Sequence, residues 1–125
     1  MTSFHDGQDM RQLLRGKIHR AVVTETDPDY VGSITVDRDL LERTDIWPGE
    51  LVLVSDVDNG ARFETYVVSA ESGSGTVAIN GAAAHLVEKG HRVIIMAFEI
   101  ADSPITPKIA LVDEKNRFVR YLHRD

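Results

Sequence analysis

A glycine-serine pair, Gly32-Ser33, lies in a stretch that otherwise predicts a β-strand. Glycine weakens the interior of a strand and often marks a close backbone approach, so a glycine directly before a hydroxyl suggests a chemical role. A serine hydroxyl can attack the preceding carbonyl if the peptide is strained, which turns the amide into an ester; elimination and hydrolysis then leave a pyruvoyl group. The pair therefore predicts a chain that cuts itself and makes its own carbonyl cofactor from Ser33.

Gly-Ser pairs also arise by chance, and the chain holds a second copy, Gly73-Ser74. At an ordinary glycine usage near ~7%, most small proteins contain one or two such pairs. The second copy lies in the Gly/Ser-rich segment 71–75, which predicts a flexible turn where backbone strain cannot be stored. The first copy is the better candidate, and its spacing alone leaves both cleavage and an ordinary turn open.

Composition bounds the remaining chemistry. The 125 residues are enough for one domain with a core of its own, since 42% of them are hydrophobic. The absence of cysteine excludes disulfides, thiolate nucleophiles, zinc ribbons and iron–sulfur clusters. The formal net charge is −6 and the basic residues are scattered, which argues against nucleic acid as a partner.

Neither a membrane span nor a signal peptide is expected. The longest apolar run, 93–98, is far shorter than the ~20 residues that cross a bilayer. Residues 1–9 are polar and lack the apolar core of a signal peptide. They predict a disordered N-terminal extension and a cytoplasmic location.

Short apolar or alternating segments bounded by turn residues predict a mainly β protein, with residues 10–125 forming one domain. Asp37 can cap a short helix over 38–43, and the alanines after Gly81 favour a second short helix that ends near residue 90. Asp-Asn-Gly at 58–60 predicts a type I′ hairpin turn. Many short strands joined by tight turns are typical of a small closed β-barrel. We expect strands at 16–24, 30–36, 51–57, 62–69, 76–80, 92–100, 108–113 and 117–122.

Four motifs follow one another along the chain: Gly16-Lys17-Ile18-His19-Arg20, Tyr30-Val31-Gly32-Ser33, Asn59-Gly60-Ala61-Arg62-Phe63-Glu64-Thr65-Tyr66 and Asn80-Gly81-Ala82-Ala83-Ala84-His85. Together they resemble the bacterial aspartate 1-decarboxylase family, over about residues 10 to 120. This family consists of pyruvoyl-dependent enzymes that make β-alanine and CO₂ from L-aspartate for pantothenate synthesis. The resemblance implies a six-stranded double-psi β-barrel with short helices, and a homotetramer with active sites between subunits. It also implies self-cleavage into a β chain, residues 1–32, and an α chain, residues 33–125.

The resemblance implies roles for individual residues as well. Ser33 matches the residue that becomes the pyruvoyl group, whose carbonyl forms a Schiff base with the substrate amine and accepts the electrons released with CO₂. Tyr66 matches the proton donor, and Thr65 matches the hydroxyl that assists cleavage at the carbonyl of Gly32. Neither a metal ion nor pyridoxal phosphate is implied.

The substrate pocket is implied in the same way. Arg62 and Lys17 match the basic residues that hold the substrate carboxylate, a task that suits the guanidinium fork. His19 and Tyr30 match residues near the cleavage site. The residues matched to substrate binding are Lys17, Arg62, Thr65, Asn80, Gly81, Ala82 and Ala83.

Each of these residues has a simpler interpretation. Arg62 and Lys17 could be solvated charges, and Tyr66 could be a packed strand aromatic. Thr65 and Tyr66 are strand neighbours that should face opposite sides, so both reach one site only across a subunit boundary or a strand distortion. Asn80-Gly81 could be only a helix start. His19 and His85 are better explained as structural than as metal ligands, since no third ligand lies at a recognisable spacing.

Other functions remain open at the level of sequence. The same machinery could decarboxylate another small amino acid. A non-catalytic double-psi barrel that binds a partner would keep Gly32-Ser33 uncleaved. A swapped-hairpin DNA-binding barrel is disfavoured by the acidic charge balance. Whether cleavage needs an accessory protein also stays open.

Overall fold

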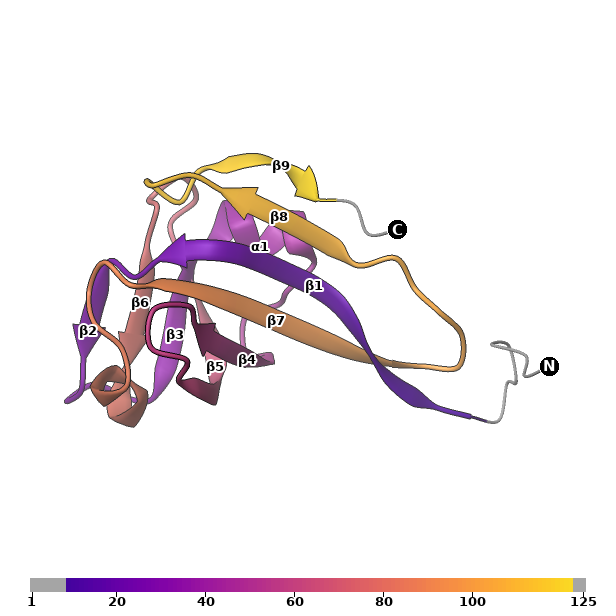
Figure 1. Cartoon of the computed structure of the whole chain (residues 1–125), viewed down its shortest axis with the longest axis horizontal. Coiled ribbons are helices and arrows are strands. Elements are labelled where there is room, and N and C mark those ends of the chain that lie inside the picture. Colours follow the sequence, from indigo (N-terminus) through magenta and orange to yellow (C-terminus); the bar gives the residue numbers. More distant parts are fainter. Residues whose placement is uncertain (1–8, 123–125) are drawn as a thin grey trace.

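A computed structural model describes residues 9–122 of the chain (Figure 1). The predicted extension, residues 1–9, lies outside the described residues except for Asp9. The described fold is mainly β, as predicted, with one α-helix and one short 3-10 helix, and neither helix has the length and apolar character needed to cross a membrane. In chain order the elements are β1 (Arg11–Val22), β2 (Glu25–Asp27), β3 (Ser33–Asp37), α1 (Arg38–Thr44), β4 (Leu51–Asp56), β5 (Arg62–Ala70), β6 (Val77–Asn80), η1 (Gly81–His85), β7 (Arg92–Ala101), β8 (Lys108–Val112) and β9 (Phe118–Leu122).

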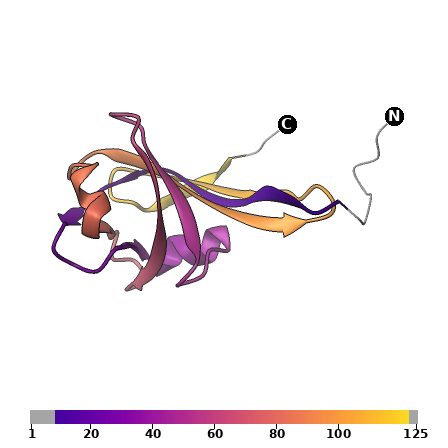
Figure 2. The ribbon, with the colours of Figure 1, turned by 90° about the horizontal axis from the view of Figure 1, so that it is seen from below.

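The strands follow the hydrogen-bonded order β2-β6-β3-β5-β4-β7-β1-β8-β9. β3 pairs in parallel with β5, and β1 pairs in parallel with β8, so the connections between these strands cross over the sheet. β1 and β7 run together away from the remaining strands (Figures 1 and 2). The described residues form nine strands, against the eight expected along the chain, and β2 and β9 end the order without pairing to each other, so a closed six-stranded barrel stays a prediction.

The core is formed by the inward side chains of the strands and by α1. On β5 the expected alternation is confirmed: Thr65 and Val67 are buried, whereas Tyr66 and Val68 are exposed. This strand therefore has one face toward the core and one toward solvent. The largest fully buried side chains include Ile18, Ile34, Val36, Leu40, Leu41, Val54, Val67, Ile79 and Ile95.

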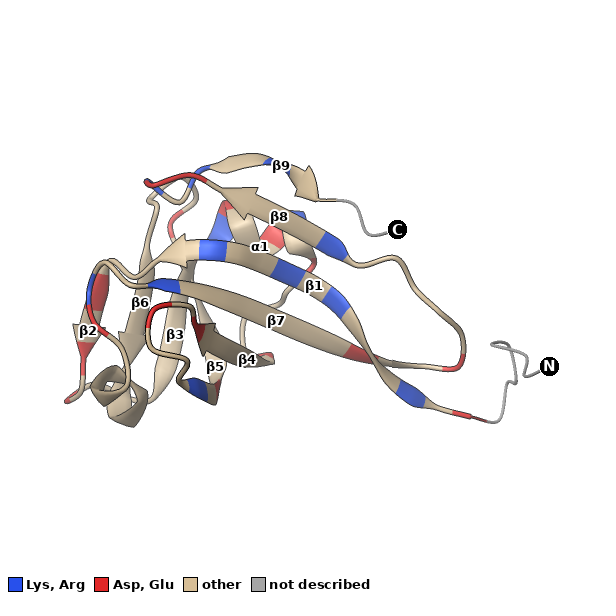
Figure 3. Ribbon diagram, viewed as in Figure 1, with Lys and Arg blue, Asp and Glu red and all other residues tan. Residues whose placement is uncertain are grey.

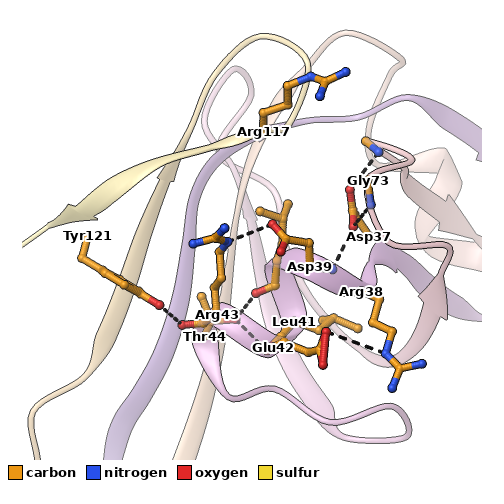
Figure 4. A network of polar contacts seen from close by, with 12 residues as sticks. Asp37, Arg38, Asp39, Leu41, Glu42, Arg43, Thr44, Gly73, Arg117 and Tyr121 are labelled. Carbon is orange, nitrogen blue, oxygen red and sulfur yellow. Dashed lines mark hydrogen bonds and ion pairs between the residues drawn. The ribbon is translucent and has the colours of Figure 1, made fainter.

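Asp37 caps α1, as predicted, and also binds the turn over residues 73–75. Its Oδ1 accepts hydrogen bonds from the backbone N–H of Asp39 at 2.9 Å and of Gly73 at 3.0 Å, and its Oδ2 accepts from Gly75 at 2.9 Å (Figure 4). The turn that holds the second Gly-Ser pair is therefore tied to the start of the helix, and the prediction of a flexible turn was wrong. A buried carboxylate that accepts several N–H groups fixes the segments that donate them.

The turn between β4 and β5 lies where it was predicted, but it is not type I′. Gly60 has a φ of +78°, whereas Asn59 is absent from the described residues with positive φ, and a type I′ turn needs both. Asp56 explains the difference: its Oδ1 accepts from the N–H of Asp58 at 2.7 Å and of Asn59 at 3.2 Å. A side chain that pairs with the backbone of the turn favours a longer loop over a two-residue hairpin turn.

Asn116 should contribute strongly to stability. It is 1% exposed with a φ of +59°, its Oδ1 accepts from Val22 N–H at 2.7 Å, and its Nδ2 donates to the carbonyls of Val22 at 2.8 Å and Gly75 at 2.9 Å. Asn116→Ala should lower the free energy of unfolding by about 2–4 kcal/mol, because it leaves buried backbone groups unpaired and puts alanine at a left-handed φ. Urea unfolding measures this loss. Lys115→Ala, in the same turn but exposed, is the control, and an equal loss in both variants would contradict the assignment.

Candidate active site

Gly32-Ser33 lies at the start of β3 rather than inside a strand. The partner strand β6 ends at Asn80, opposite Ser33, so the pairing cannot continue toward Tyr30. Ser33 is 4% exposed, and its hydroxyl donates to the carbonyl of Val31 at 3.1 Å. Asn80 Nδ2 donates to Ser33 Oγ at 3.1 Å. The serine hydroxyl is thus buried and held from two sides, in keeping with a reacting group rather than with a solvated turn residue.

Gly81 packs directly on the glycine of the pair. A Cβ added to Gly81 would lie 2.6 Å from Cα and 2.9 Å from N of Gly32, and the φ of Gly81 is +80°. Only glycine combines this dihedral angle with so close a backbone approach. Asn80-Gly81 is therefore a helix start, the beginning of η1, and at the same time the wall of the Gly32-Ser33 site. The helix ends at His85, earlier than predicted.

Thr65 joins the same place through strand register. Ile34 on β3 pairs with Val67 on β5 in parallel, so continuing the register puts Gly32 level with Thr65. Thr65 is 8% exposed and faces inward. Two of the four motifs thus meet at the Gly32-Ser33 bond, namely the bond itself and the Asn80-Gly81 corner, and a third supplies Thr65 on the neighbouring strand β5.

The charged and aromatic candidates lie on the outer face of β5 and on β1. Tyr66 is 58% exposed on the opposite face of β5 from Thr65, as the alternation predicted, and Arg62 is exposed on that same outer face. Lys17 lies on β1, next to Met96 of β7. Because β4 and β7 separate β5 from β1, Lys17 and Arg62 lie three strands apart in the hydrogen-bonded order. Lys and Arg are spread along β1 rather than gathered at one point (Figure 3). Thr65 and Tyr66 therefore lie on opposite faces of β5, whereas Ser33 alternates with the buried Ile34 and shares the face of Thr35, to whose hydroxyl Asn80 Nδ2 donates at 3.2 Å.

Ala82 is exposed and Ala83 half-buried, both on η1. Tyr30 is 60% exposed, and His85 is exposed at the end of η1. His19 is different: its Nδ1 is buried and has no hydrogen-bond partner in the described part of the chain. Burial lowers the pKa of His19, and the charges of Lys17 and Arg20 lower it further. His19 therefore stays neutral near pH 7.

No local pattern predicts the polar cluster at the β4–β5 turn. Among residues 9–122, the one group with metal-ligand spacing is Asp56, Asp58 and His91, whose ligand atoms lie within 4.8 Å of one another. Asp56 Oδ2 is 2.7 Å from His91 Nδ1, and Asp58 Oδ2 accepts from Arg92 N–H at 2.8 Å. These atoms are already hydrogen bonded to one another and to the backbone. Because His91 is 35 positions from Asp56, no local spacing could have linked them.

The comparison with known proteins agrees with the motifs. A family model described as aspartate decarboxylase matches residues 10–119. The chain belongs to the aspartate decarboxylase family. A curated relative, the aspartate 1-decarboxylase of Acetivibrio thermocellus, is 51% identical over 111 residues, which cover 86% of this chain and 88% of that protein. The matched range contains all four motifs and the Gly32-Ser33 bond.

In this aspartate decarboxylase family chain, one groove can be set aside as a site for an acidic substrate. It has a volume of about 550 Å³ and lies on the outer face of β4, β5 and β7. Three carboxylates line it, from Glu50, Glu64 and Glu99, and they would repel a dicarboxylate. The residues that suit an anionic substrate are Lys17 and Arg62, which are absent from this lining.

Proposed function

We propose that the chain decarboxylates L-aspartate to β-alanine and CO₂ and supplies β-alanine to pantothenate synthesis. Catalysis uses a pyruvoyl group made from Ser33 after the chain cleaves itself between Gly32 and Ser33. Family membership supports this function. The observation that carries the proposal is the buried Ser33 hydroxyl, which Asn80 holds beside Gly32, on whose backbone Gly81 packs too closely for any Cβ at position 81.

The residues at the bond fit the cleavage chemistry. Ser33 Oγ attacks the carbonyl carbon of Gly32, so a C–O bond forms, the C–N bond breaks and the amine of Ser33 is released. Asn80 Nδ2 donates a hydrogen bond to Oγ, and in this proposal the hydroxyl of Thr65 donates to the developing oxyanion at Gly32. Elimination then removes the α proton of residue 33 and the Gly32 carboxylate to leave dehydroalanine, which gains a proton on its CH₂ carbon to become an imine, and water hydrolyses this imine to the pyruvoyl carbonyl with release of ammonia. A pyruvoyl carbonyl offers an electrophile for the substrate amine and a sink for electrons as CO₂ leaves.

The residues on the outer faces bind the substrate and return a proton to it. Arg62 and Lys17 hold the substrate carboxylate that is retained, and the phenol of Tyr66 returns a proton to the carbon that loses CO₂. Lys17 lies three strands away from Arg62 in the hydrogen-bonded order, so we place the active site between subunits of a homotetramer, where the outer face of one subunit meets the Ser33 end of another. Asn80, Gly81, Ala82 and Ala83 form the pocket wall. No metal ion, pyridoxal phosphate, nucleic acid or membrane takes part.

The remaining parts of the proposal concern the whole chain. The crossing parallel pairs β3–β5 and β1–β8 support a double-psi barrel as the central unit of a single domain, residues 10–125. Cleavage yields a β chain, 1–32, and an α chain, 33–125, in a cytoplasmic enzyme. Whether an accessory protein assists cleavage is decided by whether purified chain cleaves alone.

Intact mass under denaturing conditions, together with CO₂ release from L-aspartate, tests the function. We expect two fragments divided between Gly32 and Ser33, the larger with an N-terminal pyruvoyl group, in a preparation that forms β-alanine. Release of CO₂ from L-glutamate in place of L-aspartate would favour the decarboxylase of another amino acid. A single uncleaved chain without decarboxylation would favour a binding module and refute the proposal. Sedimentation of the cleaved protein tests the tetramer.

A further inference from the structure

The turn between β4 and β5, residues 56–61, is anchored through a carboxylate–imidazole pair. Asp56 is 2% exposed, and its Oδ2 lies 2.7 Å from Nδ1 of His91. Its other oxygen is used by the turn itself, through the N–H groups of Asp58 and Asn59. The His91 side chain is 23% exposed, so protons from solvent reach it while Asp56 stays buried. One carboxylate thus joins the shape of the turn to the position of His91.

Further contacts tie the same turn to the segment 86–92. Asn59 Nδ2 donates to the carbonyl of Leu86 at 2.8 Å, and Val57 N–H donates to the carbonyl of Arg92 at 2.8 Å. Arg92 N–H in turn donates to Asp58 Oδ2. This segment follows η1, whose first residue packs on Gly32. Arg62 follows the turn on its other side. The anchored turn is therefore the connection between the cleavage-site wall and the strand of the substrate arginine.

We propose that His91 is a positioning residue for substrate binding, which, by holding Asp56, fixes the turn from which Arg62 extends relative to the wall of the Ser33 site. The inference rests on the proposed function, because it takes Arg62 as the group that holds the substrate carboxylate. Small displacements of a positioned group cost much of its effect on binding, so a loosened turn should raise KM.

The charges around His91 make this anchor dependent on pH. The hydrogen bond to the Asp56 carboxylate raises the pKa of His91, burial opposes it, and the charges of Asp56, Asp58 and Glu88 raise it further. Two cations lie near, Arg20 and Arg92, and the Arg92 guanidinium donates to the carbonyl of Arg20 at 3.5 Å. Because the folded state binds the proton more tightly, the charged pair is complete at acidic pH and is lost as pH rises through the raised pKa. Neutral His91 keeps a hydrogen bond without the charge.

The test compares the cleaved wild type with two variants at His91, using KM and kcat for L-aspartate from about pH 6 to 9. We expect the wild-type KM to rise by about fivefold toward alkaline pH, beyond the change in the variants, while kcat changes in parallel in all three. His91→Asn keeps an N–H near the position of Nδ1 but does not titrate, so it should remove this extra rise. His91→Ala should have a high KM at every pH.

A second measurement does not depend on activity. Amide hydrogen exchange of residues 58–60 should be about fivefold faster in His91→Ala than in wild type, with His91→Asn between them. Equal pH profiles of KM in wild type and His91→Asn, in an enzyme that cleaves and decarboxylates, would overturn this inference alone. A wild type that neither cleaves nor decarboxylates would overturn the proposed function and the role of Arg62 with it.

Discussion

Ser33→Ala leaves the chain as one uncleaved polypeptide and lowers CO₂ release from L-aspartate by more than about 10⁴-fold. Alanine has no hydroxyl to attack the carbonyl of Gly32, so neither the ester nor the carbonyl cofactor can form. Intact mass and a CO₂ assay measure the two losses separately. We expect the fold to survive, because the substitution removes a single oxygen atom with two hydrogen bonds and leaves the surrounding packing almost unchanged.

Ser74→Ala is the matched control, since it alters the other Gly-Ser pair. Ser74 Oγ accepts one hydrogen bond, from Thr76 N–H at 3.3 Å, and the pair lies in the turn tied to Asp37. This variant should cleave and decarboxylate like the wild type. Cleavage of Ser33→Ala at the same bond, or retained activity in it, would contradict the mechanism.

Gly81→Ala should impair folding and cleavage together. Its Cβ would meet the backbone of Gly32, which cannot move away as the tip of a flexible side chain could. With the strain of a φ of +80° added, we expect a loss of about 3 kcal/mol or more in the free energy of unfolding. Where the chain still folds, displacement of Gly32 should slow cleavage, which a time course of intact mass records.

Gly90→Ala separates the two causes in that experiment. Gly90 has a φ of +93° with nothing within 4 Å of an added Cβ, so alanine there meets the dihedral strain without the clash. We expect a loss of about 1–2 kcal/mol and cleavage at the wild-type rate. Equal effects of the two variants on cleavage would show that contact with Gly32 is unimportant.

Local patterns predicted most of the elements. The alternation over β5 placed Thr65 and Tyr66 on opposite faces, and Asp37 marked the start of α1, because both signals arise from neighbouring residues. β2 has three residues, too few for an alternation to show. The type of the β4–β5 turn was missed because the side chain of Asp56, outside the three turn residues, decides it.

Sequence could predict the part of the site that depends on the pairing of neighbouring strands. Within one chain Asn80 contacts Ser33 and Gly81 packs on Gly32, and Thr65 lies on the neighbouring strand β5. Lys17 and Arg62 were assigned by resemblance, and no pattern in one chain could place them opposite the inward residues. The Asp56–His91 pair lies beyond prediction, because a contact between distant loops leaves no periodic signal.

The position of β1 between two other strands determines what cleavage would do to the fold. β1 is hydrogen bonded to β7 on one side and to β8 on the other, and β2 pairs with β6, so the two strands that precede Gly32 are paired with strands that follow it. A cut after Gly32 therefore removes a covalent bond without freeing a piece. The cleaved molecule becomes a complex of two peptides, and a unimolecular folding reaction becomes a bimolecular one. If the chain is cut as proposed, we expect the uncut chain to be the form that folds, because the two pieces would have to associate before they could refold.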